Sequence, residues 1–130
     1  MRLSTAKSIG DFGEQKAVSY LRRRGYRILA RNYRAGKYEI DVIATNFTDI
    51  VFAEVKTRTY KTSELSSAPP PKNAVHSQKQ QFTRRAAQRY LYENPTKKRP
   101  RMDVIEIWLA PTSKGKKPKL LKIQHLKAAY

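Results

Sequence analysis

The chain has 130 residues, with 28 lysines and arginines against 10 aspartates and glutamates, for a formal net charge of +18. This length favours one domain over residues 1–130, and the absence of cysteine excludes disulfides, thiolate zinc sites and a cysteine nucleophile. No apolar run reaches the roughly 18 residues of a membrane span, and Met1–Gly10 lacks the apolar core of a signal peptide, so we expect a cytoplasmic protein without a membrane partner.

The first predicted element is an amphipathic helix. Ser8–Asp11 is typical of a helix start, because a serine cap is followed three positions later by an acidic residue, and Gly25 is a natural helix end. The apolar stripe between them consists of Ala17, Val18 and Leu21.

The next three elements are predicted strands, over residues 26–33, 38–44 and 50–56. The polar stretch 45–49 is short enough to join the second and third strands in a hairpin. If this hairpin closes around Phe47–Thr48, opposing positions sum to 95. Position 41 then faces 54, and position 39 faces 56. This parity also buries Val51, Ala53 and Val55 and leaves the charged side chains on the other face.

The second half of the chain begins with a proline-rich segment, which we interpret as a flexible loop at about residues 60–75 within the same domain. Ser77–Gln80 is a capping box that opens a second helix, running to about Tyr92. Strands at 102–109 and around 120–124 complete the chain. The predicted fold is α/β, a mixed sheet flanked by helices in the order α-β-β-β-α-β-β.

Two carboxylates and a lysine meet in this hairpin. Glu54 and Lys56 are two residues apart and share a face, and Asp41 lies opposite Glu54. Like charges at opposing positions destabilise a sheet, whereas a divalent cation such as Mg²⁺ (or Mn²⁺) is held by one or two carboxylates. Lys56 could then hold a water or neutralise charge at phosphorus. The alternative is purely structural: Glu39 pairs with Lys56, and an arginine pairs with Asp41.

A third carboxylate, Glu14, lies in the middle of the apolar stripe of the first helix. A carboxylate on a buried face needs a partner or a metal ion, although the helix dipole also favours an acidic residue near a helix start. Gly10 and Gly13 are costly in a helix and indicate a close approach of the backbone to another element.

The basic residues predict a polyanionic partner, because so large a surplus repels itself in the compact state. Residues 61–130 hold 16 basic and 4 acidic side chains, a balance of +12 against +6 for residues 1–60. Nucleic acid is the partner that this charge favours. We interpret Asp103, which follows two arginines, as a structural ion-pair residue, and we assign neither histidine to a metal.

The residues resemble the PD-(D/E)xK nuclease core, here Asp41…Glu54-Val55-Lys56. More closely, the chain resembles the YraN-like family, which is related to archaeal-type Holliday junction resolvases. The matching stretches cover nearly the whole chain: Gly13-Glu14, Ala17, Tyr20-Leu21, Gly25-Tyr26, Ile28-Leu29, Arg31-Asn32, Glu39-Ile40-Asp41, Val51–Lys56, Arg58, Lys79, Ala86, Tyr90-Leu91 and Asp103–Ile105.

This resemblance implies a restriction-endonuclease-like fold and a role for each candidate site residue. It implies that Asp41 and Glu54 bind the metal, that Lys56 is the catalytic lysine, and that Glu14 is an additional acidic group. It also implies a homodimer acting on branched DNA. We therefore expect a Mg²⁺-dependent endonuclease acting on DNA, branched or otherwise structured. The alternative is a protein of the same fold that binds DNA or RNA without cleaving it. The residues expected to contact nucleic acid are Lys79, Arg58, Arg84 and Arg85.

Overall fold

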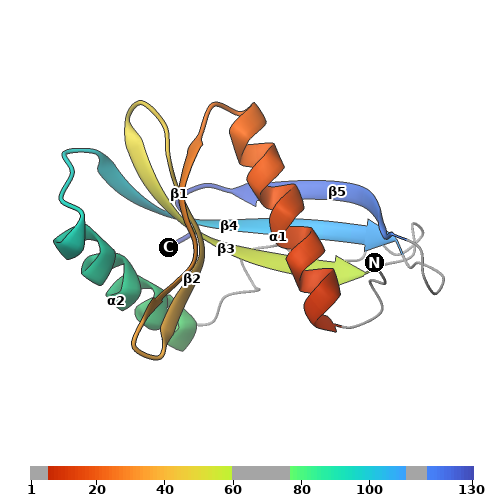
Figure 1. Ribbon diagram of the computed structural model, residues 1–130, viewed down its shortest axis with the longest axis horizontal. Helices are drawn as coiled ribbons and strands as arrows, with labels where there is room; N and C mark the ends of the chain where they lie inside the picture. The colour runs from red at the N-terminus through yellow and green to blue at the C-terminus, as the bar shows by residue number, and fades with distance from the viewer. Residues whose placement is uncertain (1–5, 60–76, 111–116) are drawn as a thin grey trace.

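The computed structural model describes residues 6–59, 77–110 and 117–130. The elements in these ranges are α1 (Ala6–Arg23), β1 (Arg27–Ala35), β2 (Tyr38–Thr45), β3 (Asp49–Thr59), α2 (Ser77–Glu93), β4 (Arg99–Ala110) and β5 (Lys119–Leu126) (Figure 1). The predicted α/β fold class and element order are confirmed. The expected loop at residues 60–75 lies outside the described residues.

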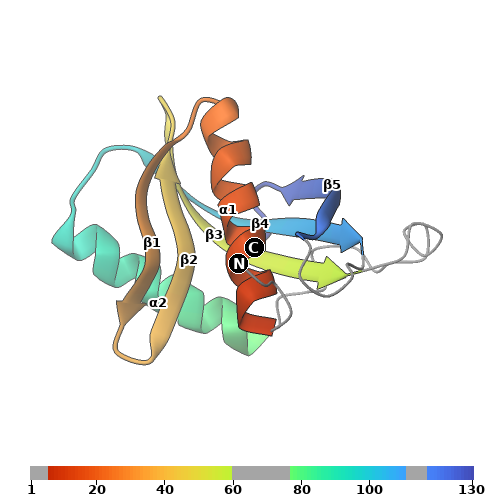
Figure 2. The same cartoon turned by 45° about the vertical axis from the view of Figure 1, so that its right-hand side comes forward.

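One mixed sheet carries the five strands in the spatial order β1-β2-β3-β4-β5. The pairs β1–β2, β2–β3 and β4–β5 are antiparallel, whereas β3 and β4 are parallel. The parallel pair follows from the chain order, because α2 lies between these two strands and carries the chain back to the end of the sheet at which β3 begins, so that β4 starts beside the start of β3. The sheet twists strongly, so that β1 and β2 run at a steep angle to β3 and β4 (Figure 2).

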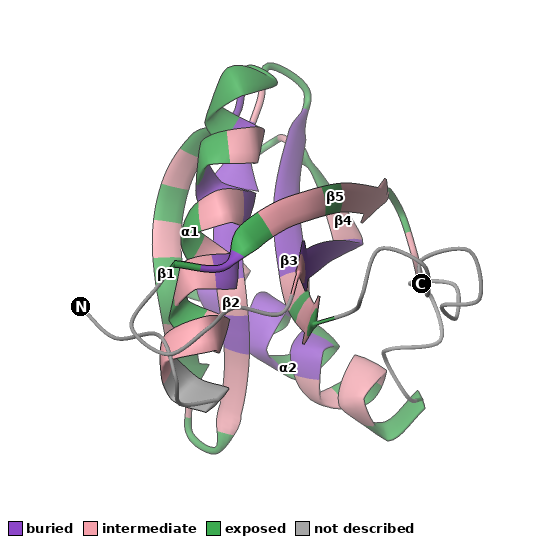
Figure 3. Cartoon of the chain, turned by 90° about the vertical axis from the view of Figure 1, so that its right-hand side faces the viewer, coloured by how far each residue is buried: buried purple, intermediate pink, exposed green. Residues whose placement is uncertain are grey.

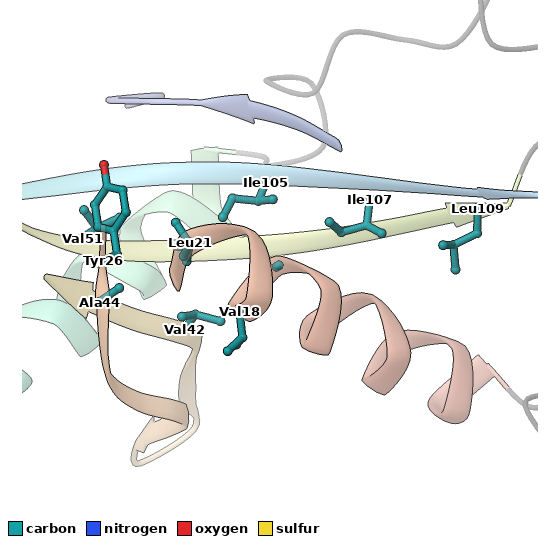
Figure 4. Close-up of a cluster of buried hydrophobic side chains, with 11 residues drawn as sticks. Val18, Leu21, Tyr26, Val42, Ala44, Val51, Ile105, Ile107 and Leu109 are labelled. Carbon is teal, nitrogen blue, oxygen red and sulfur yellow. The ribbon is translucent and has the colours of Figure 1, made fainter. Parts of the chain in front are cut away.

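The two helices cover opposite faces of the sheet, and each buries its own apolar cluster (Figure 3). The predicted stripe of α1 is confirmed and packs on β2, β3 and β4 (Figure 4). The cluster under α1 contains Ala17, Val18, Leu21, Tyr26, Val42, Ala44, Val51, Ala53, Ile105, Ile107 and Leu109. The cluster under α2 contains Ile40, Ile43, Ile50, Phe52, Ala86, Ala87 and Tyr90.

The end of α1 is set by Gly25, as predicted. This residue has φ 91°, and its N–H donates to the carbonyl of Arg22 at 3.1 Å. The N–H of Tyr26 donates to the carbonyl of Leu21 at 3.0 Å, which completes a Schellman motif. The predicted start is wrong: α1 begins at Ala6 instead of after a Ser8 cap, because alanine and lysine favour the helix and extend it by three residues.

The glycine prediction is half right. A Cβ at Gly13 would lie 1.9 Å from Oγ1 of Thr57, so α1 approaches β3 there more closely than any other residue would allow. A Cβ at Gly10 would have no described atom within 4 Å, so that glycine serves no close approach. Gly13 therefore fixes how near the first half of α1, with Glu14, comes to β3.

Candidate active site

The β2–β3 hairpin has the predicted register, but only up to the candidate site. Paired positions sum to 95 over four pairs, from Thr45↔Ile50 to Val42↔Ala53. The ladder ends there, so the expected pairs of position 41 with 54 and of position 39 with 56 are not part of it. Where it ends, Oδ2 of Asp41 accepts a hydrogen bond at 2.8 Å from the N–H of Val55, and Glu39 lies 3.6 Å from Arg34 on β1.

Asp41 and Glu54 nevertheless come together where the two strands part. Burial, and then the negative charge of Asp41, raise the pKa of Glu54 to about 7. Burial also raises the pKa of Asp41, against the effect of the hydrogen bond from Val55. The Glu54 side chain is 12% exposed, so the pair is recessed but open to solvent. Two carboxylates held this close to each other leave an excess of negative charge that a cation can relieve.

Two lysines supply positive charge beside this pair. Nζ of Lys79, on α2, lies 3.7 Å from Oε1 of Glu54. Lys56 is exposed two residues further along β3, and its charge, like that of Lys79, opposes the rise in the pKa of Glu54. Of the predicted triplet, Asp41 and Glu54 are therefore neighbours, and Lys56 acts on Glu54 through its charge. Lys79 on α2 adds a second cation next to Glu54.

Glu14 lies at the border of this group. Burial and the charge of Asp41 raise the pKa of Glu14. Oε1 of Glu14 lies 3.6 Å from Nη2 of Arg31, and the amide of Asn32, oriented to donate, lies 3.3 Å from both carboxylate oxygens. Asn32 adopts the left-handed conformation, with φ 52°. Within residues 6–59, 77–110 and 117–130, no three histidine or carboxylate side chains gather into a ready-made metal cluster.

The remaining predicted nucleic-acid contacts divide into two kinds. Arg58 forms an ion pair with Glu106, a β4 residue with 0% exposure. Arg84 and Arg85 are on the exposed side of α2; the guanidinium of Arg84 lies 5.5 Å from the ring of Tyr130, and Arg85 donates to the hydroxyl of Tyr38 at 3.0 Å. Arg84 and Arg85 are therefore accessible to a ligand, whereas Arg58 is largely engaged within the sheet.

Glu106 is a residue that the sequence reasoning missed. It pairs with Lys56 across the parallel β3–β4 ladder, and burial raises its pKa although the charge of Arg58 opposes the rise. A usable signal was present: Glu106 stands in the middle of the apolar run Met102–Leu109, where an acidic residue needs a buried partner. Lys56 thus has carboxylates on two sides, Glu54 and Glu106.

Asp103 is a structural ion-pair residue, as predicted. It accepts two hydrogen bonds from Arg101, at 2.9 and 2.8 Å, and one from Nε2 of His125 at 2.6 Å. Arg101 also donates to Asp49 at 2.8 Å, and Arg99 donates to the same carboxylate at 3.1 Å. This clamp ties the starts of β3 and β4 to the end of β5, and the part played by Asp49 was not foreseen.

Neither described helix has the length together with the apolar composition that crossing a membrane requires.

Comparison with known proteins places the chain in a family. The model described as "Uncharacterised protein family UPF0102" matches residues 13–107. A UPF0102 protein of Caldanaerobacter subterraneus subsp. tengcongensis is 38% identical over 131 residues, covering 100% of both chains. A UPF0102 protein of Alkaliphilus oremlandii is 42% identical over 127 residues, covering 95% of this chain and 98% of its own. A third, from Geobacter metallireducens, is 40% identical over 125 residues, covering 95% of this chain and 93% of its own. The chain therefore belongs to the UPF0102 family.

Proposed function

We propose that this protein is a metal-dependent endonuclease that hydrolyses phosphodiester bonds in DNA, including branched or otherwise structured DNA. The observation that carries the proposal is the meeting of Asp41 and Glu54, two mutually repelling carboxylates, beside Lys56 and Lys79. Protein cores avoid such pairs unless a cation or a shared proton compensates them. The resemblance to the PD-(D/E)xK core supports the same assignment.

The donor set suits Mg²⁺ or Mn²⁺. Both ions prefer oxygen ligands, and Mg²⁺ is usually held by one or two carboxylates, with waters and phosphate oxygens filling the other positions. Asp41 and Glu54 would hold the ion, which supplies a lowered pKa for water and charge neutralisation at the phosphate. Asp41 is kept in place for this task by the N–H of Val55.

The neighbouring side chains would orient the substrate. Lys56 points from the same strand as Glu54, so its ammonium group can hydrogen bond the attacking water or the phosphate oxygens as negative charge grows. Lys79, 3.7 Å from Glu54, would contact the phosphate next to the cleaved bond. Glu14, with its raised pKa and its neighbours Arg31 and Asn32, borders the same space.

DNA is the substrate that the charge supports. A net charge of +18 favours a polyanion through phosphate contacts and counterion release. Arg84 and Arg85 lie on the exposed side of α2, the helix that also carries Lys79, so one continuous strand could contact all three. A homodimer would present two such sites, which suits a branched substrate.

A cleavage assay tests this function. Linear, flapped and four-way DNA substrates are incubated with Mg²⁺ or Mn²⁺ and with the wild type, Asp41→Asn or Glu54→Gln. We expect each variant to lose at least about 100-fold in rate while DNA affinity is kept or rises, because repulsion of phosphate is reduced. Glu93→Gln, which removes an exposed carboxylate at the far end of α2, should cleave like the wild type. Equal metal-dependent cleavage by all four proteins would contradict the proposal.

One observation favours a second function, nucleic-acid binding without cleavage. The ion pair between Lys79 and Glu54 already gives this carboxylate a positive partner, so a lysine could take the place of a metal ion. Under this alternative, DNA or RNA binding is insensitive to Mg²⁺ and Mn²⁺, and Lys79→Gln destabilises the fold. Under the nuclease proposal, Lys79→Gln slows cleavage at saturating metal and leaves the fold intact.

A further inference from the structure

A cavity of about 230 Å³ lies at the end of α1, away from the candidate active site. Six described residues line it, from the end of α1 and the segment before β1, from the β2–β3 turn, and from the end of β5 and the residue after it: Tyr20, Arg24, Tyr26, Asn46, His125 and Lys127. Asn46 is five residues from Asp41, a separation of about 16 Å at roughly 3.3 Å per residue of strand. The cavity is therefore a separate place on the molecule.

Among the described residues that line this cavity there are cations and no carboxylate. Arg24 and Lys127 are cations and both are exposed. Two aspartates contact lining residues: Asp103 is hydrogen bonded to His125, and Asp49 to Asn46. Both carboxylates are occupied, because Asp103 accepts from Arg101, from His125 and from the N–H of Ala128, and Asp49 accepts from Arg99 and Arg101. The carboxylates that would repel an anion are thus paired with cations inside the protein.

One neutral hydrogen-bond donor is also fixed in place. It does not come from His125, whose side chain is 5% exposed and whose ring nitrogens are both engaged, Nε2 by Asp103 and Nδ1 by the hydroxyl of Tyr20 at 3.1 Å. The Tyr26 hydroxyl accepts a hydrogen bond from Nη2 of Arg101 at 2.7 Å, so its own proton remains to donate. The ring of Tyr26 is buried in the core, which prevents this hydroxyl from turning away. The cavity therefore offers one preorganised neutral donor, the Tyr26 hydroxyl, beside two cations.

A phosphomonoester fits this chemistry. It carries roughly 1.5 to 2 negative charges at neutral pH and three strong acceptor oxygens, which match two cations and the Tyr26 hydroxyl. A phosphodiester inside a strand carries only one charge, and the strand on both sides of it would have to pass through the cavity. A terminal phosphate can enter the cavity from one side. The cavity is also more enclosed than the hollow of about 290 Å³ near Leu29 and Tyr90.

We infer that this cavity binds a phosphomonoester, namely the terminal phosphate of a nucleic-acid strand. The choice of a nucleic acid as the source rests on the proposed function and on the net charge of +18. Held there, the end of a strand would be anchored about 16 Å from Asp41 by the same spacing along β2. The protein would then distinguish phosphorylated from unphosphorylated ends.

The test measures binding in EDTA, where cleavage plays no part. Fluorescence anisotropy compares oligonucleotides of one sequence that carry a 5′-phosphate, a 3′-phosphate or only hydroxyl ends. We expect one phosphorylated form to bind about tenfold more tightly than the hydroxyl form, a factor that charge-assisted hydrogen bonds readily supply. Arg24→Gln/Lys127→Gln should abolish the preference. Arg22→Gln/Lys119→Gln, which removes two exposed cations from α1 and β5 outside the cavity, should keep it.

Competition with inorganic phosphate and with a nucleoside monophosphate identifies the source of the group. One result overturns the nucleic-acid assignment: inorganic phosphate or the nucleoside monophosphate binds to the wild type and not to the cavity variant, while phosphorylation of the oligonucleotide end has no effect on affinity. The ligand is then a free small molecule. If neither phosphorylated ends nor small phosphates distinguish the cavity variant from its control, the site itself is overturned. A lack of nuclease activity leaves both readouts intact, so the two proposals fail separately.

Discussion

Gly13 sets the distance between α1 and β3. A Cβ at this position would lie 1.9 Å from Oγ1, 2.9 Å from Cγ2 and 3.0 Å from Cβ of Thr57, and the Thr57 Cβ cannot move away without shifting the strand. We therefore predict that Gly13→Ala lowers the free energy of unfolding by about 1–3 kcal/mol, as overpacking of a core does. Urea denaturation followed by circular dichroism measures this change.

Gly10 provides the control, because it lies in the same helix with no described atom within 4 Å of a built Cβ. Gly10→Ala should leave stability unchanged or raise it by about 0.4–1 kcal/mol through the lower entropy of the unfolded chain. Adding Thr57→Ala to Gly13→Ala should recover part of the loss. Equal effects of the two glycine substitutions would contradict the assigned contact.

Sequence reasoning could propose the three central residues of the candidate site because strand periodicity is a local property. Glu54 and Lys56 share a parity within one strand, and the short turn set the register that brings Asp41 next to Glu54. It could not foresee that a carboxylate oxygen of Asp41 accepts a hydrogen bond from the N–H of Val55 where the ladder ends. It also missed Glu106, because β4 joins β3 through a parallel crossover and that neighbour is set by tertiary structure.

At the scale of the elements, the clamp of Arg101 holds β3, β4 and β5 together, and its carboxylates make the fold sensitive to acid. Burial alone would raise the pKa of Asp103, but hydrogen bonds from His125 and Arg101 outweigh burial and hold the pKa below its ordinary value. Arg99 and Arg101 likewise lower the pKa of Asp49. A carboxyl group with a lowered folded-state pKa stabilises the protein above its unfolded pKa of about 3.9, and this contribution disappears as the pH falls through the folded-state pKa.

Asp103→Asn tests the clamp. The substitution should cost about 3 kcal/mol at neutral pH, because it leaves Arg101 and His125 facing a neutral amide in a buried place. The difference in unfolding free energy between wild type and variant should shrink as the pH falls below about 4. Four other carboxyl groups have raised pKa values, so they change the stability with pH in the opposite direction: Glu14, Asp41, Glu54 and Glu106. Both proteins carry these groups, so their effect cancels when the two proteins are compared at each pH. A difference that stays constant down to low pH would contradict this account.

The elements themselves were largely predictable, because each is specified by its own residues. Capping at Ser77, the glycine end of α1 and the alternation in the strands gave seven elements in the right order. Their lengths were less predictable. The third and fourth predicted strands, 50–56 and 102–109, extend to Asp49–Thr59 and Arg99–Ala110 because they pair with each other along eleven positions in the centre of the sheet. Such extension depends on a partner strand that local patterns do not contain.

At the scale of the whole molecule, the charge distribution predicts a strong salt dependence of nucleic-acid binding. Each phosphate contact by a lysine or arginine releases a counterion, so the logarithm of the association constant falls linearly with the logarithm of salt concentration. Arg84→Gln/Arg85→Gln should reduce the magnitude of this slope by about two. Anisotropy titrations between about 50 and 200 mM salt measure it. A slope unchanged in the double variant would show that this side of α2 does not contact the ligand.

The central claim is that Asp41 and Glu54 form one binding site for a divalent cation. Titration of the purified protein with Mn²⁺, followed by electron paramagnetic resonance of the free ion, tests it most directly. The account predicts saturable binding to the wild type and to Glu93→Gln, with affinity at least about tenfold weaker in Asp41→Asn and in Glu54→Gln, the loss expected for removing a metal-site residue. Equal Mn²⁺ affinity in all four proteins, or no binding by the wild type, would contradict it.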